Sequence, residues 1–207
     1  IFESMNVKVV NNARSIESTV DKLYTSYLLN KNKINCPETY IFRGQKAASR
    51  FISNYNFKSK LIYKPLFGSQ GDNIRLIERP SDLEKLENQT NIYYFQEYLD
   101  NSPNYDYRVL VINNNDNIKY FYMTRYGETF INNFSKGAKC IKEKLNEDVI
   151  ELAIKSSRLL NIDFCGVDII EYKRQYYVIE VNSIPAWKGL QKVESANISD
   201  YITSIFA

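Results

Sequence analysis

The sequence predicts an α+β protein, in which antiparallel strands and amphipathic helices share a core. Two observations predict this class. Strand candidates rich in aromatic and β-branched residues follow one another at 91–99, 105–112 and 118–125, with polar turns between them. Apolar residues recur at helical spacing in 15–30 and 146–160. With 207 residues, 44% of them hydrophobic, the chain is long enough for one large domain or two small ones.

The remaining elements are expected to be short. A strand candidate at 7–10 precedes the helix at 15–30, whose expected N-cap is Ser15. Along the chain, strands are then expected at 39–42, 60–64 and 73–77, and helices at 45–51 and 81–87, the second of them capped by Ser81. Segment 126–144 is expected to be a loop with a short strand, and 196–206 a closing helix.

Two acids and an amide gather in a predicted antiparallel hairpin near the C-terminal end. A three-residue turn at 173–175 would set Asp168 opposite Glu180. Alternation then puts Glu180 and Asn182 on one face, with Asn182 over Gly166, whose missing side chain leaves space for a polyphosphate. Magnesium prefers such carboxylate and amide oxygens, so the hairpin predicts a magnesium site. The alternative is an ordinary hairpin with exposed acids.

The composition excludes several classes of function. A net charge of +3 from 27 basic and 24 acidic residues is too weak to indicate nucleic acid as the main partner. No apolar run approaches the roughly 20 residues needed to span a bilayer, and no targeting signal is recognisable, so we expect no membrane partner and a cytoplasmic location. Histidine is absent, which excludes Ser-His-Asp and Cys-His hydrolases and leaves carboxylates, lysines, arginines and metal for catalysis. Cys36, Cys140 and Cys165 are scattered and are expected to be packing residues.

A glycine-containing loop follows the strand that ends at Lys64. The loop residues are Gly68, Ser69, Gln70 and Gly71. Two glycines let a backbone turn sharply and direct its amides toward an anion, so the loop is a candidate phosphate site. It is not a Walker loop, because it joins two strands and lacks the Gly-Lys-Ser/Thr ending. Taken alone, the loop could be a simple β-turn, and Lys22 a surface lysine.

Seven motifs that follow one another along the chain favour the functional interpretation of these residues. They are Asp21-Lys22, Lys64 with Gly68 to Gly71, Gln96-Glu97-Tyr98-Leu99, Asp106-Tyr107-Arg108, Asn133 with Lys136-Gly137, Gly166-Val167-Asp168, and Glu180-Val181-Asn182-Ser183-Ile184-Pro185. With these motifs the chain resembles the ATP-grasp superfamily and, within it, RimK-like α-L-glutamate ligases of the branch that acts on tetrahydromethanopterin. The resemblance runs nearly from end to end.

The resemblance implies an ATP-grasp fold, in which two α+β lobes clamp the nucleotide. Residues 1–14 would be a remnant of, or a link from, an upstream domain. The small lobe would span 15–95 and the C-terminal lobe 96–207, while the upstream substrate domain would be largely absent. The implied ligands of ATP are Lys22, Lys64, Gly68, Ser69, Gln70 and Gly71 for the phosphates, Gln96, Glu97, Tyr98 and Leu99 for adenine, and Asp106 for the ribose. Asp168, Glu180 and Asn182 would hold one or two Mg²⁺ ions, which Mn²⁺ would be able to replace.

The implied reaction activates a carboxylate as an acyl phosphate, which an amine then attacks to give an amide. Because phosphoryl transfer depends mainly on positioning and charge neutralisation, it needs no histidine. Arg108, Arg125 and Lys136 are the candidate donors to the tetrahedral intermediate, although Arg125 would also suit a solvated strand end. Asn133 and Trp187 are the candidate substrate contacts, with core packing as the alternative for Trp187.

The chain departs from its relatives at two positions. Lys136 stands where RimK-like enzymes usually carry arginine, and Gly166 stands where D-alanine ligases carry arginine, which favours the RimK side. We expect a ligase that adds an amino acid, glutamate in the first instance, to a coenzyme or peptide carboxylate. The alternative is a non-catalytic ATP-binding regulatory module, since fold does not fix function. Whether the chain forms a homo-oligomer stays open.

Overall fold

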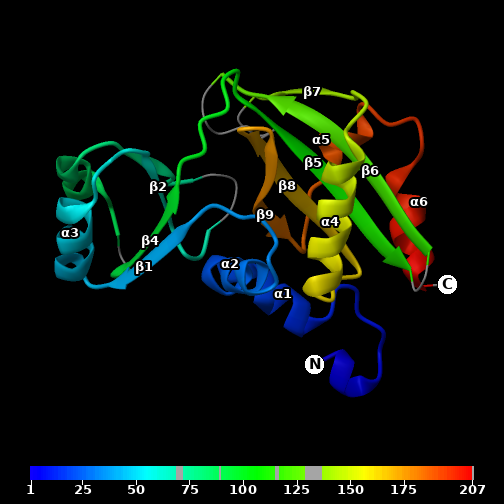
Figure 1. The fold of residues 1–207 in the computed structure, drawn as a ribbon. Coiled ribbons are helices and arrows are strands. Elements are labelled where there is room, and N and C mark those ends of the chain that lie inside the picture. The colour runs from blue at the N-terminus through cyan, green and yellow to red at the C-terminus, as the bar shows by residue number, and fades with distance from the viewer. Residues whose placement is uncertain (69–71, 89, 115–116, 129–136, 207) are drawn as a thin grey trace.

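The computed structural model describes residues 1–68, 72–88, 90–114, 117–128 and 137–206. Two antiparallel sheets form two lobes that lie side by side (Figure 1). The smaller sheet has the order β1 (Thr39–Arg43), β4 (Ile92–Glu97), β2 (Leu61–Lys64) and β3 (Arg75–Ile77). The larger has the order β7 (Lys139–Ile141), β6 (Asn117–Tyr126), β5 (Tyr105–Asn114), β8 (Phe164–Tyr172) and β9 (Gln175–Asn182). The predicted α+β class is confirmed.

Helices cover the two sheets (Figure 1). They are α1 (Ala13–Val20), α2 (Lys22–Lys31), α3 (Gln45–Asn54), α4 (Glu147–Leu159), α5 (Lys188–Gln191) and α6 (Ile198–Thr203), with 3₁₀ helices η1 (Glu3–Met5), η2 (Pro80–Lys85) and η4 (Ser204–Phe206). On the larger sheet, α4 packs against one face, and α5 and α6 pack against the other. None of the described helices is long and apolar enough to cross a membrane.

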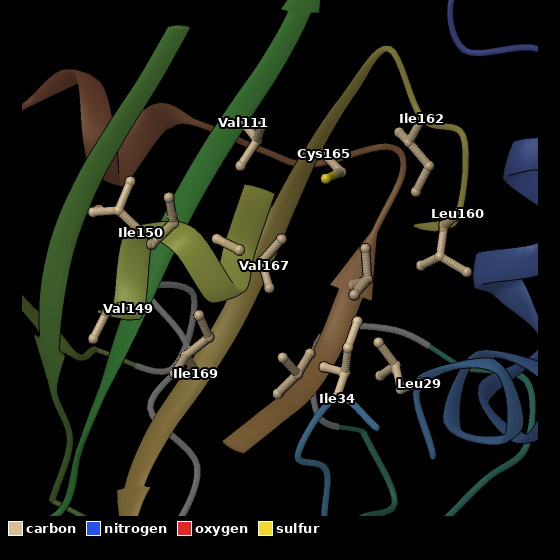
Figure 2. Close-up of a cluster of buried hydrophobic side chains, with 14 of the residues drawn as sticks. Leu29, Ile34, Val111, Val149, Ile150, Leu160, Ile162, Cys165, Val167 and Ile169 are labelled. Atoms are coloured by element: carbon tan, nitrogen blue, oxygen red, sulfur yellow. The ribbon is translucent and has the colours of Figure 1, made fainter. Parts of the chain in front are cut away.

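The two lobes have separate cores. The small lobe buries aromatic residues of its sheet against α3, with Phe95 at the centre. In the large lobe, side chains of α4 and the sheet pack together with Leu29 and Ile34 (Figure 2). Leu29 belongs to α2, so this helix packs with the large lobe even though the predicted division places it within 15–95. The buried Cys165 lies in the same cluster, as expected for a packing residue.

Three expected elements, at 15–30, 7–10 and 81–87, differ from the structure. The helix expected at 15–30 is two helices, because Asp21 adopts an extended conformation and its carboxylate accepts hydrogen bonds from the Leu23 and Tyr24 amides at 2.9 and 3.1 Å. The predicted Ser15 cap is wrong, since Asn12 caps the first of the two helices. The strand expected at 7–10 is wrong, since this segment pairs with no strand of the described chain.

The helix expected at 81–87 is the 3₁₀ helix η2, and its predicted Ser81 cap is wrong. Pro80 begins the helix because its fixed φ suits a first helical position. The carboxylate of Asp82 accepts a hydrogen bond from the Arg79 amide at 3.2 Å. The remaining expected strands and helices occur with small shifts of their ends, and the short helix α5 was not anticipated.

The hairpin reaches its predicted register by a different route. Lys173 and Arg174 have φ values of 49° and 62° and form a two-residue turn, so the expected three-residue turn is wrong. An irregularity between Asp168 and Ile169 then shifts the pairing by one residue, which sets Asp168 opposite Glu180 as predicted. Because of this bulge, Val178 and Val181 both enter the core, although they are three residues apart.

Candidate active site

Within the described residues, a cleft between the two sheets gathers most of the predicted site residues. Those that line it are Lys22, Lys64, Gly68, Gln96, Glu97, Tyr98, Leu99, Asp106, Arg125, Asp168 and Glu180. They come from α2, from the small sheet and the segments that follow β2 and β4, and from four strands of the large sheet. Residues far apart in the sequence therefore meet in one place, where a ligand would contact both lobes.

Two lysines provide positive charge in the cleft. Lys64 Nζ donates a hydrogen bond to Gln96 Oε1 at 2.6 Å, and Lys22 Nζ donates to the Gly68 carbonyl at 2.8 Å. Burial, reinforced by the charge of Lys22, lowers the pKa of Lys64 to about 8 despite the opposing effects of Glu180 and Asp168. Burial also lowers the pKa of Lys22. An anionic ligand would relieve both penalties, because it favours the charged ammonium groups.

The metal candidates occupy the hairpin as predicted. Asp168 and Glu180 are cross-strand partners, and Asn182 pairs with Gly166. Asp168 is 3% exposed and its carboxylate is ion-paired with Arg108 and Arg125, whereas Glu180 is exposed at the cleft. Within the described residues no three His, Cys, Asp or Glu side chains form a metal cluster. Two carboxylates and an amide oxygen fit a magnesium ion whose other ligands are phosphates.

Two arginines, one on β5 and one on β6, face Asp168. Arg108, its cross-strand partner on β5, donates from Nη2 to Asp168 Oδ2 at 2.8 Å. Arg125 forms a two-pronged pair with Asp106 at 2.6 and 2.8 Å and reaches Asp168 Oδ1 at 3.0 Å. Burial opposes its charge, but Asp168 and Asp106 prevail and raise the pKa of Arg125. Arg125 is 3% exposed, so the solvated strand end considered for it is wrong.

The space above Gly166 is occupied, which corrects the expectation that it would hold a polyphosphate. A Cβ atom on Gly166 would lie 2.4 Å from Arg108 Nη1 and 3.1 Å from Pro185 Cβ. Glycine is needed here because the Arg108 side chain crosses this position on its way to Asp168. Arg108 from the adjacent strand β5 thus fills the space beside Gly166.

The other predicted residues lie elsewhere. Arg108 and Asn182 stand beside the cleft but do not line it. Trp187 is half-buried in the core under α5 and α6 and meets the Phe164 ring edge-on, which is the packing alternative, so its contact with substrate stays a prediction. Ser69, Gln70, Gly71, Asn133 and Lys136 fall outside the described residues.

Sequence reasoning missed several residues that line the cleft. Ser26 and Tyr94 share a buried hydrogen bond of 2.8 Å at the cleft wall, and Ile62 and Ile170 add apolar surface. Their spacing from predicted site residues could have identified them in the sequence. Ser26 lies one helical turn after Lys22, and the other three lie two residues from a predicted site residue on the same strand face.

Two proteins with similar sequences are named as ligases. The tetrahydromethanopterin:alpha-L-glutamate ligase of Methanocaldococcus jannaschii is 29% identical over 203 residues, which cover 94% of this chain and 68% of that protein. The alpha-aminoadipate–LysW ligase LysX of Saccharolobus solfataricus is 28% identical over 211 residues, which cover 98% of this chain and 75% of that protein. These relatives support the predicted class of carbon–nitrogen ligases, and they give no support to the regulatory alternative.

Solved structures agree on the fold. A RiPP-associated ATP-grasp ligase from Chryseobacterium gregarium, in complex with ADP and a leader and core peptide, superposes with a TM-score of 0.74 at 17% identity. The match covers 99% of this chain and 64% of that one, so the chain spans about two thirds of this structure. The RimK-like ATP-grasp domain family matches residues 19–205. The predicted resemblance and the predicted fold are confirmed: the chain belongs to the RimK-like ATP-grasp family.

Proposed function

We propose that this protein is an ATP-dependent carboxylate–amine ligase that adds an amino acid, glutamate in the first instance, to a small-molecule or peptide carboxylate. One observation carries the proposal. Lys22 and Lys64 share a single cleft with Asp168 and Glu180, so cations for the phosphates lie beside carboxylates for a divalent ion. The relatives named above are ligases that, by their names, join glutamate to tetrahydromethanopterin and alpha-aminoadipate to LysW, which supports joining of an amino acid to a separate acceptor.

The reaction has two steps. The acceptor carboxylate oxygen bonds to the γ-phosphorus as the bond to ADP breaks, and the amine then bonds to the acyl carbon as phosphate leaves and the amine loses a proton. Lys22 and Lys64 hold the phosphates in line, and Arg108 and Arg125 offer donors to the oxyanion. A magnesium ion held by Asp168, Glu180 and Asn182 would neutralise charge on the β- and γ-phosphates.

The remaining roles follow the same plan. We assign adenine to the connection Gln96 to Leu99 and the ribose to Asp106, although the carboxylate of Asp106 is already engaged by Arg125. We assign the loop 68–71 to the phosphates, and Lys136, Asn133 and Trp187 to the substrates. Mn²⁺ is proposed to replace Mg²⁺, since both accept oxygen ligands.

Phosphate release from Mg-ATP tests the proposal. The protein is incubated with a panel of amino acids and with pterin, deazaflavin and peptide carboxylates. Release that requires one amino acid together with one acceptor establishes the ligase and identifies both substrates. Magnesium-dependent ATP binding without release under any combination would contradict the ligase and favour an ATP-binding regulatory module.

A further inference from the structure

A buried asparagine, Asn11, lies next to the end of the metal hairpin. It is 3% exposed and belongs to the segment before α1, which forms no strand. Its Nδ2 donates to the carbonyls of Ser183 and Phe164 at 2.6 and 2.7 Å. Its Oδ1 accepts from the amides of Asp163 and Phe164 at 2.8 and 3.0 Å. The amide group is therefore fully used, and it links the start of β8 to the residue that follows β9.

The carbonyl that Asn11 holds belongs to the peptide group between Ser183 and Ile184. This peptide is trans, so its carbonyl and its N–H point in opposite directions from one rigid plane. The N–H of Ile184 donates to Asn182 Oδ1 at 2.9 Å. A continuous chain of hydrogen bonds thus runs from Asn11 Nδ2, through one peptide group, to the oxygen assigned to the metal.

We propose that Asn11 is a positioning residue for the metal site and acts by fixing the orientation of Asn182. Fixing the Ser183–Ile184 plane fixes the direction from which its N–H meets Asn182 Oδ1. That oxygen then keeps its second lone pair for a cation. The hydrogen bonds also polarise one another, because each donor in a chain strengthens the next. This inference rests on the proposed function, in which Asn182 binds a metal.

The purely structural alternative is that Asn11 only fastens the N-terminal segment to the sheet. The two roles differ in their coupling to Asn182. If Asn11 acts through Asn182, its loss costs nothing further once Asn182 is gone. If it acts only on the fold, the two losses add.

The experiment measures the metal gain, defined as the Kd of AMP-PNP in EDTA divided by its Kd in Mg²⁺. Asn11→Ala is expected to lower the metal gain about tenfold, as loss of a group that orients a metal ligand commonly does, and to leave the Kd in EDTA unchanged. The double variant Asn11→Ala with Asn182→Ala should show the same gain as Asn182→Ala alone. The matched control is Asn113→Ala, which removes another amide that bridges Ser157 and Ile162, each at 2.5 Å, and should keep the wild-type gain.

Each other outcome has a definite meaning. A normal gain in Asn11→Ala beside a reduced gain in Asn182→Ala overturns the role of Asn11 alone, as does a double variant whose losses multiply. A normal gain in Asn182→Ala removes Asn182 from the metal site, and the inference fails with it, while phosphate release still tests the ligase separately. If Asn11→Ala does not fold, an amide-to-ester exchange at Ile184 decides, since it removes the N–H that meets Asn182 Oδ1, weakens the Ser183 carbonyl as an acceptor from Asn11, and should lower the gain by a similar factor.

Discussion

Lys64 is a lysine whose charge the folded protein disfavours, and this makes its function sensitive to pH. Its pKa is lowered to about 8, so the free protein loses this ammonium as the pH rises through that value. Phosphate oxygens favour the charged form, and ATP affinity should therefore fall above pH 8. We expect the Kd of ATP to rise about tenfold between pH 7 and 9.5, since each pKa unit corresponds to 1.36 kcal/mol.

Lys64→Arg is the matched control, because a guanidinium stays charged throughout this range. Titration calorimetry of both proteins should show a much flatter profile for the arginine variant, because the side chain at position 64 then keeps its charge. Identical pH profiles would show that Lys64 does not bind the phosphates in its charged form.

Gly166 is required by its neighbour and not by its own backbone. Alanine there would place a Cβ atom 2.4 Å from Arg108 Nη1, and the flexible end of Arg108 would have to move away from Asp168. We expect Gly166→Ala to fold with a stability loss of about 1 to 3 kcal/mol, and to lose most ligase activity. In an Arg108→Ala background the same substitution should cost clearly less stability by denaturant unfolding. An equal cost in both backgrounds would mean that Arg108 is not the obstacle.

At the scale of elements, two helix caps allow an effect on stability to be distinguished from an effect on ATP binding. Asn12 caps α1 by accepting from the Ser15 amide at 2.9 Å, and Asp21 caps α2 beside Lys22. Alanine at either position should lower stability by about 1 kcal/mol. Only Asp21→Ala should also weaken ATP binding, because it loosens the first turn that positions Lys22. Asp21→Asn keeps the cap and should bind normally. Equal ATP affinities in Asn12→Ala and Asp21→Ala would contradict this role of α2.

The hairpin shows which features of this site could be predicted from the sequence and which could not. The pairing of Asp168 with Glu180 was predicted from a three-residue turn, and alternation along the strand put Glu180 and Asn182 on one face. The turn was misjudged, since two left-handed residues followed by a bulge give the same register as a three-residue turn. The filling of the space above Gly166 was not predictable, because it depends on Arg108 from β5, and the pairing of β5 with β8 is not encoded locally. By contrast, the helix break at Asp21 was missed although the sequence carries a signal for it, because aspartate favours the cap position of a helix.

At the scale of the molecule, the nucleotide is expected to join two lobes that have separate cores. Lys64 comes from the small sheet, whereas Lys22, Asp168 and Glu180 come from α2 and the large sheet, and all four line one cleft. A ligand held by both groups can be bound only while both lobes are folded and in place. Unfolding of either lobe then requires release of the ligand. This adds about 2.7 kcal/mol to the free energy of opening at a ligand concentration of 100 times Kd.

Hydrogen exchange provides the measurement. With Mg²⁺ and AMP-PNP, amides of β2 and β4 should gain protection together with those of β8 and β9, each by up to about a hundredfold at that concentration. Lys64→Ala should reduce the gain in the small sheet more than in the large one when both proteins are compared at the same fraction bound, because it removes a small-lobe contact to the phosphates. Protection confined to β8 and β9 in the wild-type protein would show that the small lobe does not hold the nucleotide, and the two-lobe clamp would be rejected.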